Sequence, residues 1–328
     1  MRVVFFVFVF ILSVPVLAEE MGCSAAARSL HLACGFDVRE ENLIRRANCI
    51  NTNDTMQAEE CLLASVDERQ EEAEECSDVL AARLELCEAM NDAPHEVSFG
   101  EDFADNFVDP RDIGSTVEPN PFFPLVAGNN WVYEGTSVDE DDAEEVTETI
   151  TVTVTNKVKL IEGILCVVVV DTAEEDGEII EQTDDWFAQD EDGNVWYCGE
   201  ISQNFEFFDG DEPEEGELVD IDGSWKSGRD NAKAGLLLPV EPVIGQVFRS
   251  ELLNTDAEDA VEILSLEGTE SSPAAACNEN CLVTRDFSPL EPDAEENKYY
   301  LPGIGLIVEI DLESGARVEL IEYTVGGN

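Results

Sequence analysis

Basic residues are scarce in this chain. Its 328 residues include 17 Lys and Arg against 75 Asp and Glu, which gives a formal net charge of −58 at pH 7. Such a surface repels phosphate backbones and anionic lipids, so we expect no nucleic-acid partner and no electrostatic binding to membranes. The acidic residues are spread along the chain, which favours solubility in salty water as the reason for the charge. Binding of divalent cations, calcium in particular, is the alternative explanation.

Histidine is scarcer still, with only His31 and His95 in the chain. A structural zinc site would therefore need several free cysteines. The chain also lacks a G-x-S-x-G motif and a glycine-rich phosphate loop, and Ser224 has no histidine near it in the sequence. With 75 acidic residues, a glycosidase-like pair of carboxylates could be drawn anywhere and indicates nothing. These absences predict a non-enzymatic protein without a cofactor, and an uncharacterised hydrolase is the weakest alternative.

No segment is apolar over the roughly 20 residues that a membrane-spanning helix needs. The most apolar stretch is MRVVFFVFVFILSVPVLA, residues 1–18. Its basic start, its apolar core and the small residues Val16 and Ala18 predict a secretory signal peptide, and the apolar core is too short for a membrane anchor. We expect cleavage after Ala18 and a soluble product that is exported to the periplasm or the extracellular space.

The chain contains ten cysteines, an even number. In an oxidising compartment such a set predicts five disulfides rather than metal ligands or nucleophiles. The cysteines expected in disulfides are Cys23, Cys34, Cys49, Cys61, Cys76, Cys87, Cys166, Cys198, Cys277 and Cys281.

Residues 19–92 have the composition of helices, rich in Ala, Glu, Leu and Arg and without Trp or Tyr. Their cysteines form three pairs in sequence, and the members of each pair are about three helical turns apart. On one continuous helix the two Cα atoms of a pair would lie about 16 Å apart, whereas a disulfide needs less than about 7 Å. We therefore expect disulfides between antiparallel helices, with the connectivity left open.

Capping residues and helix breakers predict the boundaries of this N-terminal module. One helix is expected to begin at Asp54 or Thr55, and another at Ser65 or Asp67. Residues 93–119 lose all periodicity and contain several prolines and glycines, so they are predicted to be a linker.

Residues 120–328 have the pattern of strands. Ile150, Val152 and Val154 alternate with threonines, as in a sheet with one buried and one solvated face. Turn sequences such as Asp192-Gly193-Asn194 separate the apolar runs, as in hairpins. The sequence thus predicts an α+β protein: a small disulfide-linked helical module, then a large antiparallel β domain that is an open barrel or a strongly curved sheet.

The four cysteines of the predicted β domain allow three connectivities. We favour the long-range bonds Cys166–Cys281 and Cys198–Cys277, and a local ring between Cys277 and Cys281 is the alternative. Cys166 and Cys198 are expected on strands with one other strand between them, which is too far apart for a direct bond.

Three acidic turns are weak candidates for calcium binding. In the first, the residue order resembles a calcium loop, but Val195 stands where the sharp turn requires glycine. Trp225 breaks the second in the same way, and the third is a plain run of acids. Hairpin turns explain the first two motifs without a metal. The candidate residues are Asp190, Asp192, Asp209, Asp211, Asp220 and Asp222.

The stretch NPFFPLVAGNNWVYEG, residues 120–135, is apolar and carries a single charged residue. Pro121 and Pro124 exclude a central strand, so we predict that it enters the β domain as a plug rather than as an exposed partner-binding patch. The aromatic residues of the strands are expected mainly in the core, and a concave face for an apolar ligand is the alternative. These residues are Trp131, Trp186, Trp196, Phe205, Phe207, Trp225 and Tyr299.

Three stretches, NPFFPLVAGNNWVYEG, DDWFAQDEDGNVWYCGE and KYYLPGIGLIVEIDLESGARVELIEY, resemble a family of exported bacterial proteins of unknown function. The resemblance covers roughly residues 119–325. It implies a β domain that opens with NPFFPL and WVYEG and closes with KYYLPGIGL, and it brings no established activity or catalytic residues. The closing motif is also similar to that of curved-sheet periplasmic proteins that shelter acyl chains, although a shared fold does not by itself give a function.

These observations together predict a secreted, highly acidic, non-enzymatic protein. We expect a binding or envelope-structural role, with an apolar small molecule as the ligand to be tested first. Calcium binding through the acidic turns is the second hypothesis.

Overall fold

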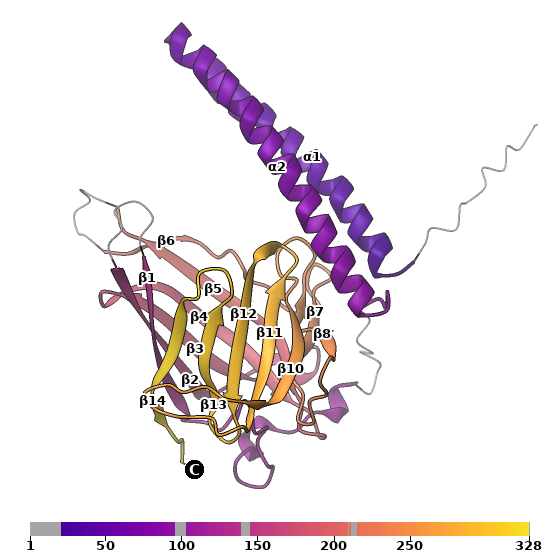
Figure 1. Cartoon of the computed structure of the whole chain (residues 1–328), viewed down its shortest axis with the longest axis vertical. Coiled ribbons are helices and arrows are strands. Elements are labelled where there is room, and N and C mark those ends of the chain that lie inside the picture. The colour runs from indigo at the N-terminus through magenta and orange to yellow at the C-terminus, as the bar shows by residue number, and fades with distance from the viewer. Residues whose placement is uncertain (1–20, 96–102, 139–144, 209, 211–214, 328) are drawn as a thin grey trace, which may run out of the picture.

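The computed structural model describes residues 21–95, 103–138, 145–208, 210 and 215–327. In this part of the chain, two long antiparallel helices precede a 14-stranded antiparallel sheet that curls into a nearly closed barrel (Figure 1). The predicted α+β class, with a disulfide-linked helical module before the β domain, is confirmed.

The helices are α1 (Cys23–Ile50) and α2 (Thr55–Ala89). Asp54 caps α2, because its side chain accepts hydrogen bonds from the backbone N–H groups of Met56 at 2.8 Å and Gln57 at 3.2 Å. The predicted helix start at Ser65 or Asp67 is wrong, since α2 continues through both residues. The helices therefore form one hairpin, with residues 51–54 as its turn.

Three disulfides join α1 to α2 as predicted. Two of them, Cys23–Cys87 and Cys34–Cys76, link cysteines from different sequence pairs, with Cα–Cα distances of 5.4 and 5.9 Å. The third, Cys49–Cys61, has a Cα–Cα distance of 5.5 Å and lies within a pair whose members we had expected to be too far apart. The assumption of a continuous helix fails there, because the hairpin turn separates the two cysteines and brings them opposite each other.

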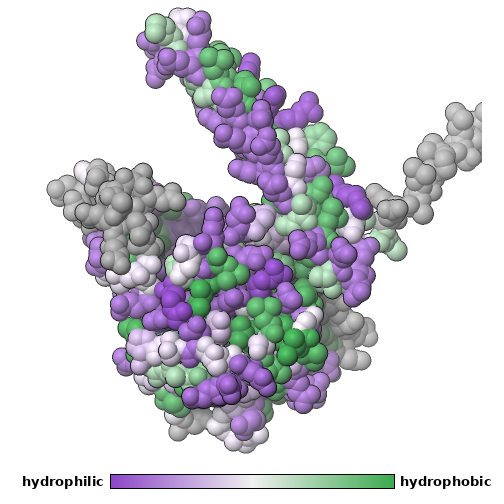
Figure 2. Space-filling model, in the orientation of Figure 1, coloured by the Kyte–Doolittle hydropathy of each residue, from purple (hydrophilic) through white to green (hydrophobic). Residues whose placement is uncertain are grey.

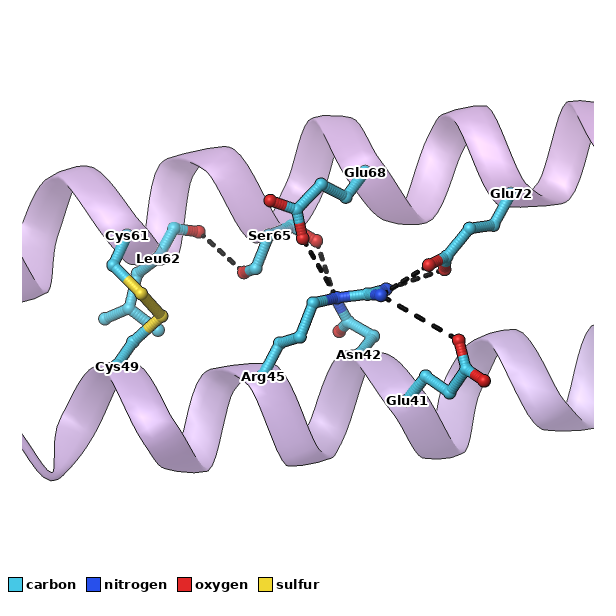
Figure 3. Close-up of polar contacts among 9 residues, drawn as sticks. All are labelled: Glu41, Asn42, Arg45, Cys49, Cys61, Leu62, Ser65, Glu68 and Glu72. Atoms are coloured by element: carbon cyan, nitrogen blue, oxygen red, sulfur yellow. Dashed lines mark hydrogen bonds and ion pairs between the residues drawn. A yellow bond between two sulfur atoms is a disulfide. The ribbon is translucent and has the colours of Figure 1, made fainter. Parts of the chain in front are cut away.

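Polar side chains fill the seam between the helices near the turn (Figure 3). The Arg45 guanidinium lies 3.0 Å from Glu68 and donates to both carboxylate oxygens of Glu72, one of them at 2.6 Å. Asn42 donates to the Ser65 carbonyl oxygen at 2.6 Å. Because the Arg45 side chain is 28% exposed, these ion pairs fix the register of the helices more than they stabilise the hairpin.

The hairpin stands clear of the barrel over much of its length (Figure 1) and carries exposed apolar side chains, seen as green surface in Figure 2. Leu32, Phe36 and Leu43 on α1 are each 67% exposed. The hairpin lies against the β domain at its base and beside residues 290–293. At the base, Arg83 forms a two-pronged ion pair with Glu258, at 2.7 and 2.8 Å, and both side chains are almost fully buried.

The sheet is antiparallel throughout, with the strand order β8-β10-β11-β12-β13-β14-β1-β2-β3-β4-β5-β7-β9, and β6 pairs with β5. Strands β7 and β8 lie in contact, so the two ends of the order meet and the barrel nearly closes. The strands are β1 (Asn130–Val138), β2 (Glu145–Ile161), β3 (Ile164–Glu175), β4 (Glu178–Gln189), β5 (Val195–Glu206), β6 (Glu217–Asp220), β7 (Lys233–Leu238), β8 (Val247–Arg249), β9 (Glu251–Leu252), β10 (Ala260–Gly268), β11 (Cys281–Ser288), β12 (Glu291–Leu301), β13 (Gly305–Asp311) and β14 (Arg317–Thr324).

Residues 120–125 close one end of the barrel, in agreement with the predicted plug. The Asn120 side chain, which is fully buried, accepts from the backbone N–H groups of Phe122 and Phe123 and donates to the Gly193 carbonyl oxygen at 2.8 Å. Leu125 is buried in the main core. The proline-rich stretch thus folds back across the strand ends instead of joining the sheet.

The described residues of the predicted linker pack on the β domain. They form the short 3-10 helices η1 (Phe103–Asn106) and η2 (Pro110–Asp112). Ile113 is 2% exposed and belongs to the main core. Residues 96–102 of this segment lie outside the described residues.

All ten cysteines are in disulfides, as predicted, but both favoured bonds of the β domain are wrong. The structure has Cys166–Cys198 and Cys277–Cys281 instead. Cys166 lies on β3 and Cys198 on β5, with β4 between them, as we expected. Cys198 is the extra residue of a β-bulge in the β4–β5 pairing, and bending at that bulge leaves the two Cα atoms 6.9 Å apart.

Candidate functional site

The inner face of the barrel is apolar next to the plug. Trp131, Val167 and Phe187 are each less than 7% exposed there and pack into one cluster. The Trp131 indole donates to the Ile304 carbonyl oxygen at 2.8 Å. This end of the barrel, which we call the closed end, is filled with protein side chains.

Further from the plug the same inner face becomes charged. On β3, Asp171 follows Val167 and Val169 with the period of two that keeps it on the inner face, and on β4 Asp185 precedes Phe187 in the same way. Burial and then the charge of Asp185 raise the pKa of Asp171, so these two carboxylates lie near each other. Burial, then Tyr300 and the charges of Asp171 and Glu309, raise the pKa of Tyr133 well above its usual value, so Asp171 and Glu309 also lie near that side chain.

One group of these charges, the lysine cluster, consists of Lys298 and three carboxylates. The Lys298 ammonium lies 3.1 Å from Glu296, 3.2 Å from Glu309 and 3.6 Å from Asp286. Burial acts to lower the pKa of Lys298, but the charges of Glu309, Asp286 and Glu296 outweigh it and raise that pKa well above its usual value. This lysine therefore stays charged inside the barrel, held by carboxylates from three strands.

The lysine cluster retains accessible surface although its side chains point inward. Lys298 and Glu309 are each 22% exposed, and Asp286 is 20% exposed. These charged side chains therefore keep some contact with solvent, unlike the side chains of the closed end.

A second group of carboxylates, which we call the acidic layer, consists of Asp171, Asp185, Glu200, Glu251 and Asp259. None of the five forms an ion pair within the described part of the chain. Burial, followed by the charges of Asp185 and Glu181, raises the pKa of Asp171 to about 8. Like the lysine cluster, the acidic layer thus contains several carboxylates, but it has no basic side chain among them.

Tyr197 links two members of the acidic layer. Its hydroxyl lies 2.5 Å from an Asp185 oxygen and 2.7 Å from a Glu200 oxygen. A tyrosine hydroxyl has one proton and can donate to one carboxylate only, so the second contact requires a proton on a carboxyl group. Burial raises the pKa of Glu200 to about 7, and burial with the charge of Glu200 raises that of Asp185 well above its usual value. The two contacts to Tyr197 therefore require a proton on either Asp185 or Glu200.

Glu251 is the most deeply buried member of the acidic layer, at 6% exposure. One of its carboxyl oxygens has no hydrogen-bond partner, and neither has the indole nitrogen of Trp225. The indole is close enough to lower the pKa of Glu251 slightly, but the contact falls short of hydrogen-bond geometry. Burial and the charges of Asp259 and Glu200 dominate and raise that pKa well above its usual value. A buried carboxyl oxygen without a donor is costly, and the unpaired indole of Trp225 is the donor that lies beside it.

The seven aromatic residues that were candidates for an apolar ligand do not gather at one place. Trp131 lies in the core of the closed end, Trp186 packs beside the Cys166–Cys198 bond, and Trp225 belongs to a separate small cluster. Trp196 packs against Phe103 of η1. The remaining three are partly exposed: Phe205, Phe207 and Tyr299.

Of the calcium candidates, Asp190 and Asp192 lie in the turn between β4 and β5, Asp220 is the last residue of β6, and Asp222 follows it. Asp190 accepts from the Asn194 backbone N–H at 2.8 Å and from the Trp196 indole at 2.9 Å. Asp220 accepts from Asn204 at 2.6 Å. Asp192 and Asp222 are exposed, whereas Asp209 and Asp211 lie outside the described residues. Among the residues that the structure describes, no three His, Cys, Asp or Glu side chains are placed to hold a metal ion together.

Sequence reasoning did not find the acidic layer. Tyr197 and Glu200 are three residues apart, so a regular strand would put them on opposite faces. The bulge at Cys198 adds one residue and returns both side chains to the inner face. Gly199 was the signal in the sequence that could have indicated this bulge. A Cβ atom at this position would lie 2.5 Å from the Trp225 carbonyl oxygen, and its φ is +130°.

In comparisons with known proteins, no family model, curated protein or solved structure matches the chain. In the described part of the chain, neither helix combines the length and the hydrophobicity that crossing a membrane requires.

The acidic layer predicts that stability falls as the pH rises. An unfolded Asp releases its proton near pH 4, whereas folded Asp171 holds it until about pH 8. Between these values the folded state binds more protons, so the free energy of unfolding decreases with pH, by at most about 1.4 kcal/mol per pH unit for this group. Urea unfolding at pH 5 and pH 8 measures the change. Asp171→Asn should flatten the profile, and an equally steep profile in that variant would contradict the assignment.

Proposed function

We propose that this protein is an exported, non-enzymatic binding protein whose barrel takes up a small molecule in the charged half of its interior. The observation that carries the proposal is the difference in side-chain exposure between the closed end of the barrel and the lysine cluster. The closed end is filled, whereas the side chains of the lysine cluster are 20–36% exposed. Concave sites that mix aromatic walls with a few convergent polar groups are typical of ligand binding.

Export is part of this proposal and is supported by the disulfides. Five disulfides in one chain are typical of oxidising compartments. The N-terminal sequence of the protein purified from culture supernatant or periplasm tests this part. A start at Glu19 supports processing by a signal peptidase, and an intact Met1 in the mature protein contradicts it.

A thermal-shift panel with a matched pair of variants tests the binding site. The probes are hexylamine, hexanoate, hexanol, glucose and calcium chloride. Asp171→Phe places a ring on the inner face of β3, and Thr172→Phe places the same ring on its outer face. We expect at least one probe to raise the melting temperature of the wild type and of Thr172→Phe but not of Asp171→Phe. The proposal is wrong if no probe separates the two variants.

A further inference from the structure

A pocket of about 330 Å³, which we call the junction pocket, lies at the base of the hairpin, where the helices meet the β domain beside β7 and β8 (Figure 1). The start of α1 and the end of α2 line it from the hairpin, and residues of β7, β8 and β9 line it from the β domain. Its volume falls within the roughly 300–1,000 Å³ of small-molecule sites. It shares no lining residue with the lysine cluster or the acidic layer, so it is separate from the barrel interior.

Basic side chains, which are scarce in this chain, gather in the junction pocket. Arg83, Lys233 and Arg249 line it together with His95, and Glu258 is the one carboxylate of the lining. Three basic groups against one acidic group give the lining a formal charge of +2 when histidine is neutral. By contrast, two other pockets along α2 are lined by five and six carboxylates. An anion that the rest of the surface repels is therefore attracted here.

Arg249 is the basic residue of the junction pocket whose charge is left unpaired. It is 6% exposed, yet it forms no ion pair with any residue that the structure describes. Burial lowers the pKa of Arg249, and the charge of Glu258 offsets this only in part. Buried charges are normally paired, because an unpaired charge that has lost its water is costly. The pocket therefore lacks the counter-charge that this arginine requires.

The guanidinium of Arg249 also has unused hydrogen-bond donors. Its Nη1 donates to the Glu258 carbonyl oxygen at 3.2 Å, and neither Nε nor Nη2 donates to any described residue. These two nitrogens keep some accessible surface, and the pocket is the space that Arg249 lines. The unused donors are thus available to a molecule in the junction pocket.

The neighbouring Arg83–Glu258 pair shows how an arginine holds a carboxylate in this pocket. Arg83 donates from Nε at 2.8 Å and from Nη2 at 2.7 Å to the two oxygens of Glu258. These are the same two nitrogens that Arg249 leaves unused. The planar fork of a guanidinium matches a carboxylate with two parallel hydrogen bonds. A second carboxylate, brought by a ligand, would complete Arg249 as Glu258 completes Arg83.

We propose that the junction pocket binds the carboxylate of a small organic acid through Arg249. The inference goes beyond the proposed function, because it assigns a second site outside the barrel interior. Lys233, whose ammonium donates to the His95 carbonyl oxygen at 3.0 Å, adds positive charge to the lining. A monocarboxylate supplies one counter-charge to Arg249 without bringing the second negative charge of a phosphate close to Glu258.

The rest of the lining favours an acid with an apolar chain. Apolar surface comes from Ala26, Ala27 and Leu30 of α1, from Pro94 and from Leu252 of β9. An alkyl chain attached to the carboxylate would bury its surface against these side chains. An inorganic phosphate or sulfate ion would leave them without a contact.

Titration calorimetry of the disulfide-bonded protein with hexanoate, hexanamide and inorganic phosphate tests the assignment. Hexanamide has the length of hexanoate without its charge, and phosphate has charge without a chain. We expect hexanoate to bind, hexanamide to bind at least about tenfold more weakly, and phosphate not to displace hexanoate, because a tenfold change corresponds to about one charge-assisted hydrogen bond. Absence of hexanoate binding, equally tight binding of hexanamide, or displacement of hexanoate by phosphate would overturn the assignment.

A first pair of variants tests the role of Arg249. Arg249→Lys keeps the charge but removes the planar fork, so it should weaken hexanoate binding at least about tenfold. Arg285→Lys is the matched control, because Arg285 lines one of the acidic pockets along α2 and should be replaceable without an effect on hexanoate. Equal binding by the two variants would contradict the role of Arg249.

A second pair of variants fills the pocket without changing its charge. Ala26 lines the junction pocket and is exposed on α1, so Ala26→Phe should fold and should abolish hexanoate binding. Ala47→Phe places the same ring at an exposed position of α1 outside the pocket and should bind as the wild type does. Melting temperatures check that both variants are folded, and hexanoate binding that survives in folded Ala26→Phe would overturn the assignment.

Asp171→Phe distinguishes this inference from the proposed function. The substitution acts inside the barrel, so hexanoate binding at the junction pocket should be unchanged in it. If Asp171→Phe abolishes hexanoate binding while Arg249→Lys and Ala26→Phe retain it, the acid binds in the barrel. That result would leave the proposed function standing and would show that the junction pocket is not the site.

Discussion

Glu258→Ala is expected to destabilise the protein by about 3–5 kcal/mol and to detach the helical hairpin from the barrel. The substitution leaves the Arg83 guanidinium, 4% exposed, without its partner at the only close-fitting polar contact between hairpin and barrel among the described residues. It also removes the acceptor for the Thr255 backbone N–H. Chemical unfolding gives the loss of free energy, and hydrogen exchange shows whether protection falls at the base of α2.

The matched control is the double variant Arg83→Met with Glu258→Leu. Two apolar side chains of similar size leave no buried charge unpaired, so this variant should recover most of the stability that Glu258→Ala loses. If the single and the double variant are equally unstable, the loss comes from packing rather than from an unpaired charge, and the ion-pair explanation is wrong.

Trp131→Ala should cost a similar amount, about 3–5 kcal/mol, by opening a cavity in the closed end. Trp131 is 1% exposed, stacks on Tyr323 with ring centres 5.4 Å apart and contacts Phe123 of the plug at 5.8 Å. Its removal also leaves the Ile304 carbonyl oxygen without the indole donor. Because the plug rests on this side chain, we expect residues 120–125 to lose protection from hydrogen exchange together with the strands around them.

Trp196→Ala is the matched control for that result. Trp196 lies outside the main core, packs against Phe103 and Phe107, and is only partly buried. We expect a loss of about half that of Trp131→Ala, confined to η1 and the Asp190 turn. Equal losses in the two variants would mean that the closed end is no more tightly packed than the outer surface.

Local pattern was enough to predict the architecture. Alternating residues such as Ile150, Val152 and Val154 identified the strands, and alanine- and glutamate-rich sequence identified the helices. The even number of cysteines correctly predicted five disulfides. Each of these inferences depends only on residues close together in the chain, which is the range over which periodicity carries information.

The remaining features depend on irregularities that periodicity does not encode. One bulge at Cys198 decides both the Cys166–Cys198 bond and the side of the sheet on which Glu200 lies. The hairpin turn decides the Cys49–Cys61 bond in the same way. The acidic layer combines residues from β3, β4, β5 and β9 with Asp259, and strand pairing brings these together from positions up to 88 residues apart in the printed sequence. In a chain with 75 acidic residues, no local signal distinguishes these five from the rest.

The three disulfides that join α1 to α2 make the hairpin a rigid arm. Its helices cannot slide past each other, and its ion pair with the β domain at Arg83 is near one end, so we expect the arm to move as a unit if it tilts about that end. From Arg83 to Thr55 the arm is about 42 Å long, at about 1.5 Å per residue. For an arm of this length, a tilt of about 10° at the base would move the tip by about 7 Å while the helices themselves change little. A force applied to the tip would therefore act on Glu258, which is the neighbour in sequence of Asp259 in the acidic layer.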